Sequence, residues 1–241
     1  MRRIAALLLP ALALIASPLA AREAVTQTTA AITEISWTAT DANGSERLVE
    51  VEPAPVPQGI ARFGPFRVID ARRAALVDVT DSRAPAQFAA LLGAFPAIAE
   101  LDLVECPGTE DDRANLALGR MIHARGIATR VPAGGSVRSG AVELFLAGSR
   151  RIAEPGAEFA VHSWEDEDGR QAGDYPADAP ENRAYLDYYR EMGMDPQQAR
   201  AFYAMTNSVP FERARWLSAE EMAGWVRLDR PESLDSAPRL N

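Results

Sequence analysis

From residue 66 onward, short apolar segments alternate with amphipathic ones, and this alternation limits the fold more than any other feature of the chain. Residues 99–105 have the length and composition of a strand, and residues 111–125 follow them with helical spacing. In that second segment apolar residues recur every three or four positions, and Gly126 ends it as a helix terminator. Strands that alternate with helices predict an α/β fold with parallel strands.

The same patterns predict the other elements of the chain. We expect strands at 66–70, 74–80, 99–105, 127–133 and 157–164, and helices at 85–95, 111–125, 140–147, 183–192, 196–205 and 219–226. Residues 165–180 are acidic and contain glycine and proline, which predicts a mobile loop. The run EDEDG in this loop lacks the ligand spacing and the closing glutamate of a calcium site, so a solvated loop is favoured.

The N-terminal segment has the features of an export signal. Arg2 and Arg3 precede an apolar run over residues 4–16, and small residues lead to Ala21. We predict a signal peptide over residues 1–21 and a periplasmic or secreted protein, because the run is shorter than the ~20 apolar residues that span a bilayer. An uncleaved anchor is the alternative. Residues 22–60 then form a β extension, a hairpin of 32–39 with 46–53 and a proline-marked linker, and residues 61–241 form the main domain.

Charge and residue usage exclude several classes of function. The chain has 34 acidic residues against 25 basic ones and a net charge of −9, which argues against binding nucleic acid or anionic membranes. Cys106 is the single cysteine, and His123 and His162 are the only histidines, so we expect no disulfide, metal or other cofactor. Every basic residue is an arginine, so a nucleophilic serine depends on histidine, or on a carboxylate, for activation.

The segment VECPGTEDD is the first candidate for chemistry, at a predicted strand-to-helix junction. Pro107 and Gly108 permit a sharp turn, and we expect Thr109 to cap the helix, with Asp112 completing an acidic capping box. The backbone N–H groups of such a turn can stabilise an oxyanion. An ordinary connecting turn is the competing interpretation.

Ser139 and His162 are the second and third candidates. Ser139 stands where a helix begins after a glycine-rich segment, so it is either a helix cap or a nucleophile beside the N–H of Gly140. His162 ends a predicted strand, where it is either a packed core residue or a general base. His123 lies off the apolar stripe near the end of its helix, and we interpret it as a structural or surface residue.

Taken in order, the segments CPGT, RSGAVELFLAGSRR, EPGAEF and AVH resemble the proteolytic subunit of the Clp protease family. In that family a strand ending in Ser-Pro-Gly-Gly precedes a helix, a serine begins the next helix, and a later strand ends in histidine. The separation of Ser139 and His162 and the segment RWLSAEEMAGWVRLD are also similar. The resemblance spans residues 66–229 and implies a ClpP/crotonase-like spiral of β-β-α units, extended by a small N-terminal β-hairpin.

The resemblance also implies roles for individual residues. Ser139 corresponds to the nucleophile and His162 to the general base, and the N–H groups of Thr109 and Gly140 correspond to the oxyanion hole. Two positions depart from the family pattern, since Thr109 replaces a glycine and Ala214 stands where an acidic third catalytic member is usual.

Three residues are candidates for orienting the histidine in the absence of that acid. By sequence, Asn207 and Glu212 are the nearest polar candidates for a third member. Glu143 lies four residues after Ser139 on the same predicted helix, and we interpret it as a surface or subunit-interface charge.

The function that these patterns favour is an exported serine hydrolase, a peptidase that acts on a peptide or protein substrate through an acyl-enzyme. The resemblance is compatible with a homo-oligomer, and no ATPase partner is assumed, because exported compartments lack ATP. An esterase or amidase of similar chemistry is one alternative. The other is a binding or scaffold protein with a decayed site, since loss of the orienting acid can cost ~10⁴ in rate.

Overall fold

The computed structural model describes residues 39–40, 46–47 and 52–230. The predicted signal peptide, and most of the predicted β extension, lie outside these residues. Within the extension, Ala39–Thr40 (β1) and Glu46–Arg47 (β2) pair in antiparallel fashion on either side of the predicted turn. In the described part of the chain, no helix is long and apolar enough to cross a membrane.

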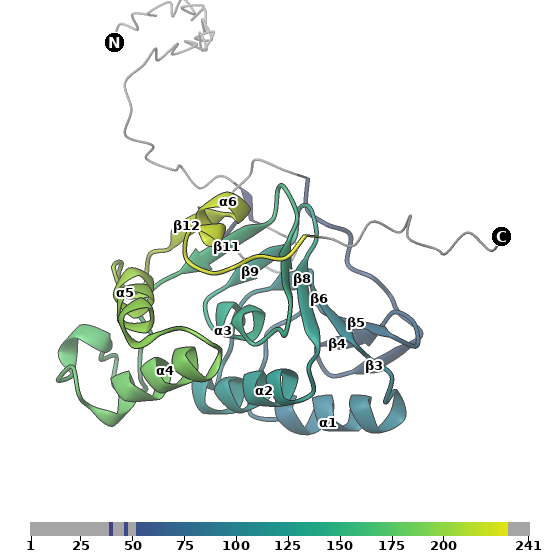
Figure 1. The fold of residues 1–241 in the computed structure, drawn as a ribbon, viewed down its shortest axis with the longest axis horizontal. Coiled ribbons are helices and arrows are strands. Elements are labelled where there is room, and N and C mark those ends of the chain that lie inside the picture. Colours follow the sequence, from purple (N-terminus) through teal and green to yellow (C-terminus); the bar gives the residue numbers. More distant parts are fainter. Residues whose placement is uncertain (1–38, 41–45, 48–51, 231–241) are drawn as a thin grey trace, which may run out of the picture. The chain divides into compact units, whose positions relative to one another are not determined.

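Ten further strands form two sheets (Figure 1). The larger sheet has the strand order β10-β8-β6-β5-β4-β3, and the smaller has the order β12-β11-β9-β7. Their bounds are Ala61–Phe63 (β3), Phe66–Val68 (β4), Arg73–Leu76 (β5), Glu100–Leu103 (β6), Glu105–Cys106 (β7), Ala128–Val131 (β8), Ser136–Arg138 (β9), Arg151–Ala153 (β10), Glu158–Val161 (β11) and Arg215–Ser218 (β12).

Consecutive strands of the core fall alternately into the two sheets. β6 belongs to the larger sheet and β7, which follows it, to the smaller, and a helix comes next. β8 and β9 repeat this order before the next helix. The pairings β5–β6, β6–β8, β8–β10, β7–β9 and β9–β11 are all parallel, whereas β3–β4, β4–β5 and β11–β12 are antiparallel. The predicted α/β class and its β-β-α units are therefore confirmed.

The helices cover these units and carry the amphipathic segments of the sequence. Their bounds are Ala84–Ala94 (α1), Asp112–Ala124 (α2), Ala141–Leu146 (α3), Pro180–Glu191 (α4), Pro196–Thr206 (α5) and Ala219–Ala223 (α6). Helices α1, α2 and α3 follow one another along one side of the strands, with α1 against α2 and α2 against α3 (Figure 1). All six expected helices form, and the second, third and last are shorter than predicted.

Four strands differ from the sequence prediction. Strands β3, β9, β10 and β12 were not expected, and β9 occupies part of the segment interpreted as a glycine-rich loop. β9 is polar but buried, because Arg138 forms an ion pair with Glu105 and donates to Ser136 Oγ at 2.7 Å. The acidic loop 165–180 has a defined course, with an antiparallel bridge between Glu165 and Gln171 and a short 3-10 helix, η1, at Ala172–Asp174.

Candidate active site

Ser139 lies immediately after β9 in a backbone conformation that serine rarely adopts. Its φ is +50°, and among the described residues it is the only one other than glycine with a positive φ. A left-handed conformation costs a residue with a Cβ atom roughly 1–2 kcal/mol. The Ser139 N–H donates to Ala160 O at 2.8 Å, and its carbonyl accepts from Val142 N at 3.0 Å, so bonds on both sides hold the turn. Strain of this kind collects at functional sites.

The structure corrects the expectation that Ser139 starts the helix as a side-chain cap. The N-cap of α3 is Gly140, and no side chain caps this helix. Among the described residues, the Ser139 hydroxyl makes no hydrogen bond. The hydroxyl is therefore not engaged in capping and is left for other chemistry.

His162 follows the last residue of β11, and β11 pairs in parallel with β9. The carboxyl ends of the two strands therefore bring Ser139 and His162 to the same edge of the sheet. His162 Nδ1 lies 2.8 Å from Ser163 O, and because a carbonyl can only accept, Nδ1 carries the proton. In the neutral imidazole, Nε2 is then the acceptor. Phe211 packs edge-on against the imidazole, with ring centroids 4.9 Å apart.

The turn at Pro107–Thr109 passes directly beside Ser139. Gly108 has φ +132°, and a Cβ atom there would lie 2.9 Å from Ser139 Cβ. Only glycine readily adopts this φ and lacks the Cβ atom that would clash. The backbone of the turn therefore packs directly against Ser139. The helix that follows begins differently from the sequence prediction, because its N-cap is Asp111, which accepts from Ala114 N at 2.9 Å. Thr109 is not the cap and instead accepts from Asp111 N through its hydroxyl.

Two backbone N–H groups face the region of Ser139. Thr109 forms a parallel bridge with Thr80, in which Thr80 N donates to Gly108 O and Glu110 N donates to Thr80 O. Alternate backbone groups of a strand point to opposite edges, so the Thr109 N–H points away from Thr80 and toward the Ser139 edge. The Gly140 N–H follows Ser139 directly. Neither N–H donates to another described residue.

Thr80 and Asn115 position these two segments, and sequence reasoning did not select either residue. Both are buried, and Thr80 Oγ1 donates to Asn115 Oδ1 at 3.1 Å. Asn115 Nδ2 donates to Gly140 O at 2.5 Å, while Thr80 holds Gly108 O through its backbone N–H at 3.1 Å. The pair thus ties the turn before α2 to the turn before α3. For Asn115, the signal available in the sequence was a polar residue within a segment of helical apolar spacing.

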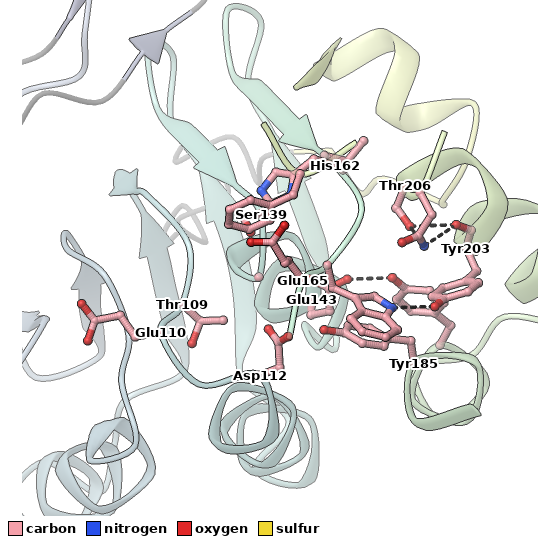
Figure 2. A pocket seen from close by; sticks show the side chains of 16 residues that line it. Thr109, Glu110, Asp112, Ser139, Glu143, His162, Glu165, Tyr185, Tyr203 and Thr206 are labelled. Carbon is pink, nitrogen blue, oxygen red and sulfur yellow. Dashed lines mark hydrogen bonds between the residues drawn. The ribbon is translucent and has the colours of Figure 1, made fainter. Parts of the chain in front are cut away.

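A cavity of about 250 Å³ opens beside Ser139 and His162. Figure 2 shows these two side chains on one side of the cavity and Tyr185 and Tyr203 on another. Of the sequence-predicted residues, Thr109, Ser139, Gly140, His162 and Asn207 all line it. The other lining residues are Glu110, Asp112, Glu143, Val161, Trp164, Glu165, Tyr185, Tyr189, Tyr203, Thr206 and Phe211.

The structure separates the two candidates for a third catalytic member. Asn207 lines the cavity, and its Nδ2 donates to Tyr203 O at 2.8 Å and to Thr206 Oγ1 at 3.1 Å. Its Oδ1 is buried without a hydrogen bond in the described part of the chain, and it does not accept from His162. Glu212 is exposed and lies outside the cavity lining. The Ser163 carbonyl is the group that orients the imidazole.

Glu143 is buried rather than a surface charge, which corrects the expectation from sequence. Its side chain is 6% exposed and lines the cavity from α3, where Oε1 accepts from Tyr189 Oη at 2.7 Å. Burial raises the pKa of this carboxyl to about 7, and the hydrogen bond from Tyr189 only partly opposes the rise. Glu143 lies in the first turn of α3, and its side chain and that of Ser139 line the same cavity.

The start of the acidic loop borders the cavity. Trp164 and Glu165 line it, and Gln171 joins the loop to the segment before β12 by accepting from Phe211 N at 3.0 Å. Trp164 Nε1 donates to Tyr203 Oη at 2.7 Å. The loop therefore holds the segment of Phe211, whose ring packs against His162. His123, by contrast, is exposed on α2, with Nδ1 3.2 Å from Ala147 O, far along the helix from this cavity.

Comparison with known proteins gives partial structural likenesses. No family model and no curated protein matches the chain. One similar solved structure is a mutant of the membrane-bound stomatin-specific protease 1510-N in complex with a substrate peptide, at 15% identity over 64% of this chain and 74% of that chain, with a TM-score of 0.44. Another is a mutant of ClpP1 from Listeria monocytogenes, at 16% identity over 67% of this chain and 91% of that chain, with a TM-score of 0.46. The assignment of Ser139 and His162 therefore depends on the geometry of this chain itself.

Proposed function

We propose that the protein is an exported serine hydrolase that cleaves peptide bonds through an acyl-enzyme, with Ser139 as nucleophile and His162 as general base. The observation that carries this proposal is the left-handed turn at Ser139. It presents an unbonded hydroxyl to a cavity that is shared with a histidine whose Nδ1 carries the proton. A strained nucleophile beside an oriented base is the arrangement that acyl transfer requires.

The reaction follows from the positions of these groups. His162 Nε2 accepts the proton of the Ser139 hydroxyl while the oxygen attacks the carbonyl carbon of the substrate. Negative charge develops on the carbonyl oxygen, and the N–H groups of Thr109 and Gly140 are the donors for it. The imidazolium then gives its proton to the leaving amine, and water releases the acyl group by the same route. Catalytic hydrogen bonds of this kind often tighten only in the substrate complex.

A peptide substrate fits the surroundings of the site. A second cavity, of about 340 Å³, adjoins the first and shares Asp112, Trp164, Glu165 and Tyr185 with it. Its remaining lining comes from α2, α4 and the acidic loop. The two cavities together provide room for residues on more than one side of the bond to be cleaved. Export rests on the apolar N-terminal segment, and a compartment without ATP implies a hydrolase that works without an ATPase partner.

Labelling with a fluorophosphonate tests the nucleophile directly. We expect the wild-type protein to be labelled on the peptide that contains Ser139, and mass spectrometry locates the adduct. Labelling should be abolished in Ser139→Ala and strongly reduced in His162→Ala. His123→Ala is the matched control, because His123 is exposed and outside the cavity. Equal labelling of His162→Ala and wild type would refute the dyad. A separate comparison, of activity on a peptide library with activity on a panel of esters, distinguishes a peptidase from an esterase.

One observation favours a second candidate, a binding protein with a decayed site. His162 Nδ1 donates to a backbone carbonyl and not to a carboxylate. Loss of the carboxylate from a serine hydrolase triad lowers turnover by ~10⁴. A folded, monodisperse wild-type protein that resists the fluorophosphonate but binds peptides would establish this candidate in place of the enzyme.

A further inference from the structure

The cavity beside Ser139 is unusually rich in acidic groups. Four carboxylates line it, and none of the arginines in the described part of the chain does. The set consists of Glu110, Asp112, Glu143 and Glu165. Three of them lie toward the solvent side, whereas Glu143 is buried at the wall formed by α3. The potential inside such a cavity is negative, and low-dielectric walls intensify it.

Glu143 differs from the buried carboxylates Glu105 and Asp102 because no cation in the described part of the chain accompanies it. Glu105 pairs with Arg138 at 2.5 Å, and Asp102 pairs with Arg130 at 3.2 Å. Across residues 52–230, Glu143 forms no ion pair, and its partner is the neutral Tyr189 hydroxyl. A buried carboxyl is stabilised by a proton or by a paired cation, and among the described residues no cation pairs with Glu143, so it is an acceptor that a cationic group in the cavity can use.

The hydrogen bonds among the side chains that line the cavity also favour a positively charged ligand. Tyr189 donates to Glu143, Tyr203 donates to Asn182 Oδ1 at 2.5 Å, and Trp164 donates to Tyr203. These donors are therefore already used within the wall. Asn207 Oδ1 is a buried acceptor with no donor among the described residues. Acceptors are in excess, so a ligand that suits this wall supplies N–H donors.

Aromatic rings complete the wall. Trp164 and Tyr185 lie nearly parallel, at 8° with centroids 6.4 Å apart, and Tyr203 packs against Tyr185 with centroids 5.9 Å apart. Rings of this kind attract a cation over their faces, by about 0.5–2 kcal/mol according to how far it is desolvated. They also pack against the methylene groups of a long side chain, which would enter the cavity before its charged end.

We propose that this cavity selects substrates with a basic side chain, arginine or lysine, on the residue whose carbonyl group Ser139 attacks. This proposal rests on the proposed hydrolase function and names its substrate class. Glu143 accepts the cationic group, Asp112 and Glu165 supply negative potential at the entrance, and Trp164, Tyr185 and Tyr203 contact the aliphatic part.

The position of Glu143 suits this assignment. It lies in the first turn of α3, which begins two residues after Ser139, and both residues line the same cavity. A cation brought to Glu143 also favours the ionised carboxylate and so offsets the burial that raises its pKa. Substrate binding and ionisation of Glu143 are therefore coupled.

Matched peptides test this proposal. One fluorogenic peptide carries arginine before the cleaved bond, and its partner carries citrulline, which has the same shape without the charge. We expect wild type to cleave the arginine peptide with a kcat/KM at least about tenfold higher, and Glu143→Gln to bring the ratio of the two peptides close to one. Glu167→Gln is the control, because Glu167 is an exposed glutamate of the acidic loop outside the cavity and its ratio should match wild type.

Two further measurements keep the test decisive. If Glu143→Gln does not fold, Asp112→Asn at the exposed rim should still lower the arginine-to-citrulline ratio severalfold. Binding of N-acetyl-arginine methylamide and its citrulline counterpart to Ser139→Ala, measured by calorimetry, reports selectivity without any cleavage. Arginine-selective binding by a protein that resists the fluorophosphonate would refute the hydrolase but support the basic-side-chain site. Labelling of Ser139 with equal cleavage of the two peptides would overturn the specificity and leave the hydrolase intact.

Discussion

Replacing Glu143 with glutamine should change how the stability of the protein depends on pH. The carboxyl has a pKa of about 7 in the folded protein against 4.5 for an ordinary glutamate, chiefly because it is buried, with Asp112 adding a smaller repulsive effect. The folded state thus binds this proton more tightly than the unfolded state. The stability that the protonated group provides is complete below pH 4.5 and is lost as the pH rises toward 7.

The size of this loss follows from the same two values. Each tenfold change in proton affinity is worth about 1.4 kcal/mol, so the shift corresponds to about 3 kcal/mol of unfolding free energy. The neutral glutamine keeps the acceptor for Tyr189 Oη and does not titrate. Glu143→Gln should therefore be close to wild type in stability at pH 4.5 and about 3 kcal/mol more stable relative to it at pH 8.

Urea unfolding at half-unit pH steps from 4.5 to 8, followed by tryptophan fluorescence, measures this difference. Glu167→Gln, which removes an exposed negative charge instead, controls for the change in net charge. A constant free-energy difference between wild type and Glu143→Gln across this range would show that the carboxyl is not buried as described. The surrounding groups of the cavity wall, Tyr188, Tyr189 and Asp112, stay unchanged in the comparison.

Three other expectations follow from the geometry of the site and from the sequence. Ser139→Gly should be about 1 kcal/mol more stable to urea than Ser139→Ala, because glycine relieves the strain of φ +50° by more than it costs in unfolded-chain entropy; the reverse order would contradict the left-handed turn. Gly140→Ala should lower the fluorophosphonate labelling rate, since its Cβ would lie 2.5 Å from Thr109 Cγ2, and adding Thr109→Ser, which removes that methyl group, should restore part of the rate. No recovery in the double variant would show that the contact with Thr109 is not what slows the reaction. N-terminal sequencing of exported material should begin near Arg22, whereas recovery of Met1 would indicate an uncleaved anchor.

Most local elements could be predicted from the sequence, since they depend on short-range patterns, whereas the candidate dyad was assigned from the resemblance of an ordered set of segments to a known family. Helix α2 shows the limit of prediction from short-range patterns. The sequence predicted an apolar stripe at positions 114, 117, 118, 121 and 122. Only 118 and 122 of these are buried, together with Asn115, Leu116 and Gly119, and Asp111 rather than Thr109 caps the helix. Periodicity finds a helix but does not reveal that a polar residue on its face has partners from distant strands, here Thr80 and Gly140.

Strand β9 and Glu143 depended on tertiary contacts in the same way. Ser136 and Arg138 make β9 look like a loop in the sequence, but pairing with β7 and β11 and the ion pair to Glu105 bury them. Glu143 is polar by sequence and is buried only because α4 brings Tyr188 and Tyr189 over it.

The sequence by itself determined the alternation of strands and helices, the absence of lysine and the order in which Ser139 and His162 occur. The tertiary structure decided that the two strand ends meet, that Ser139 adopts a strained turn beside Gly108, and that His162 Nδ1 bonds to the Ser163 carbonyl. These features arise from parallel pairing between segments more than twenty residues apart. Local propensities do not contain that information, because each such pairing depends on what the rest of the chain places next to it.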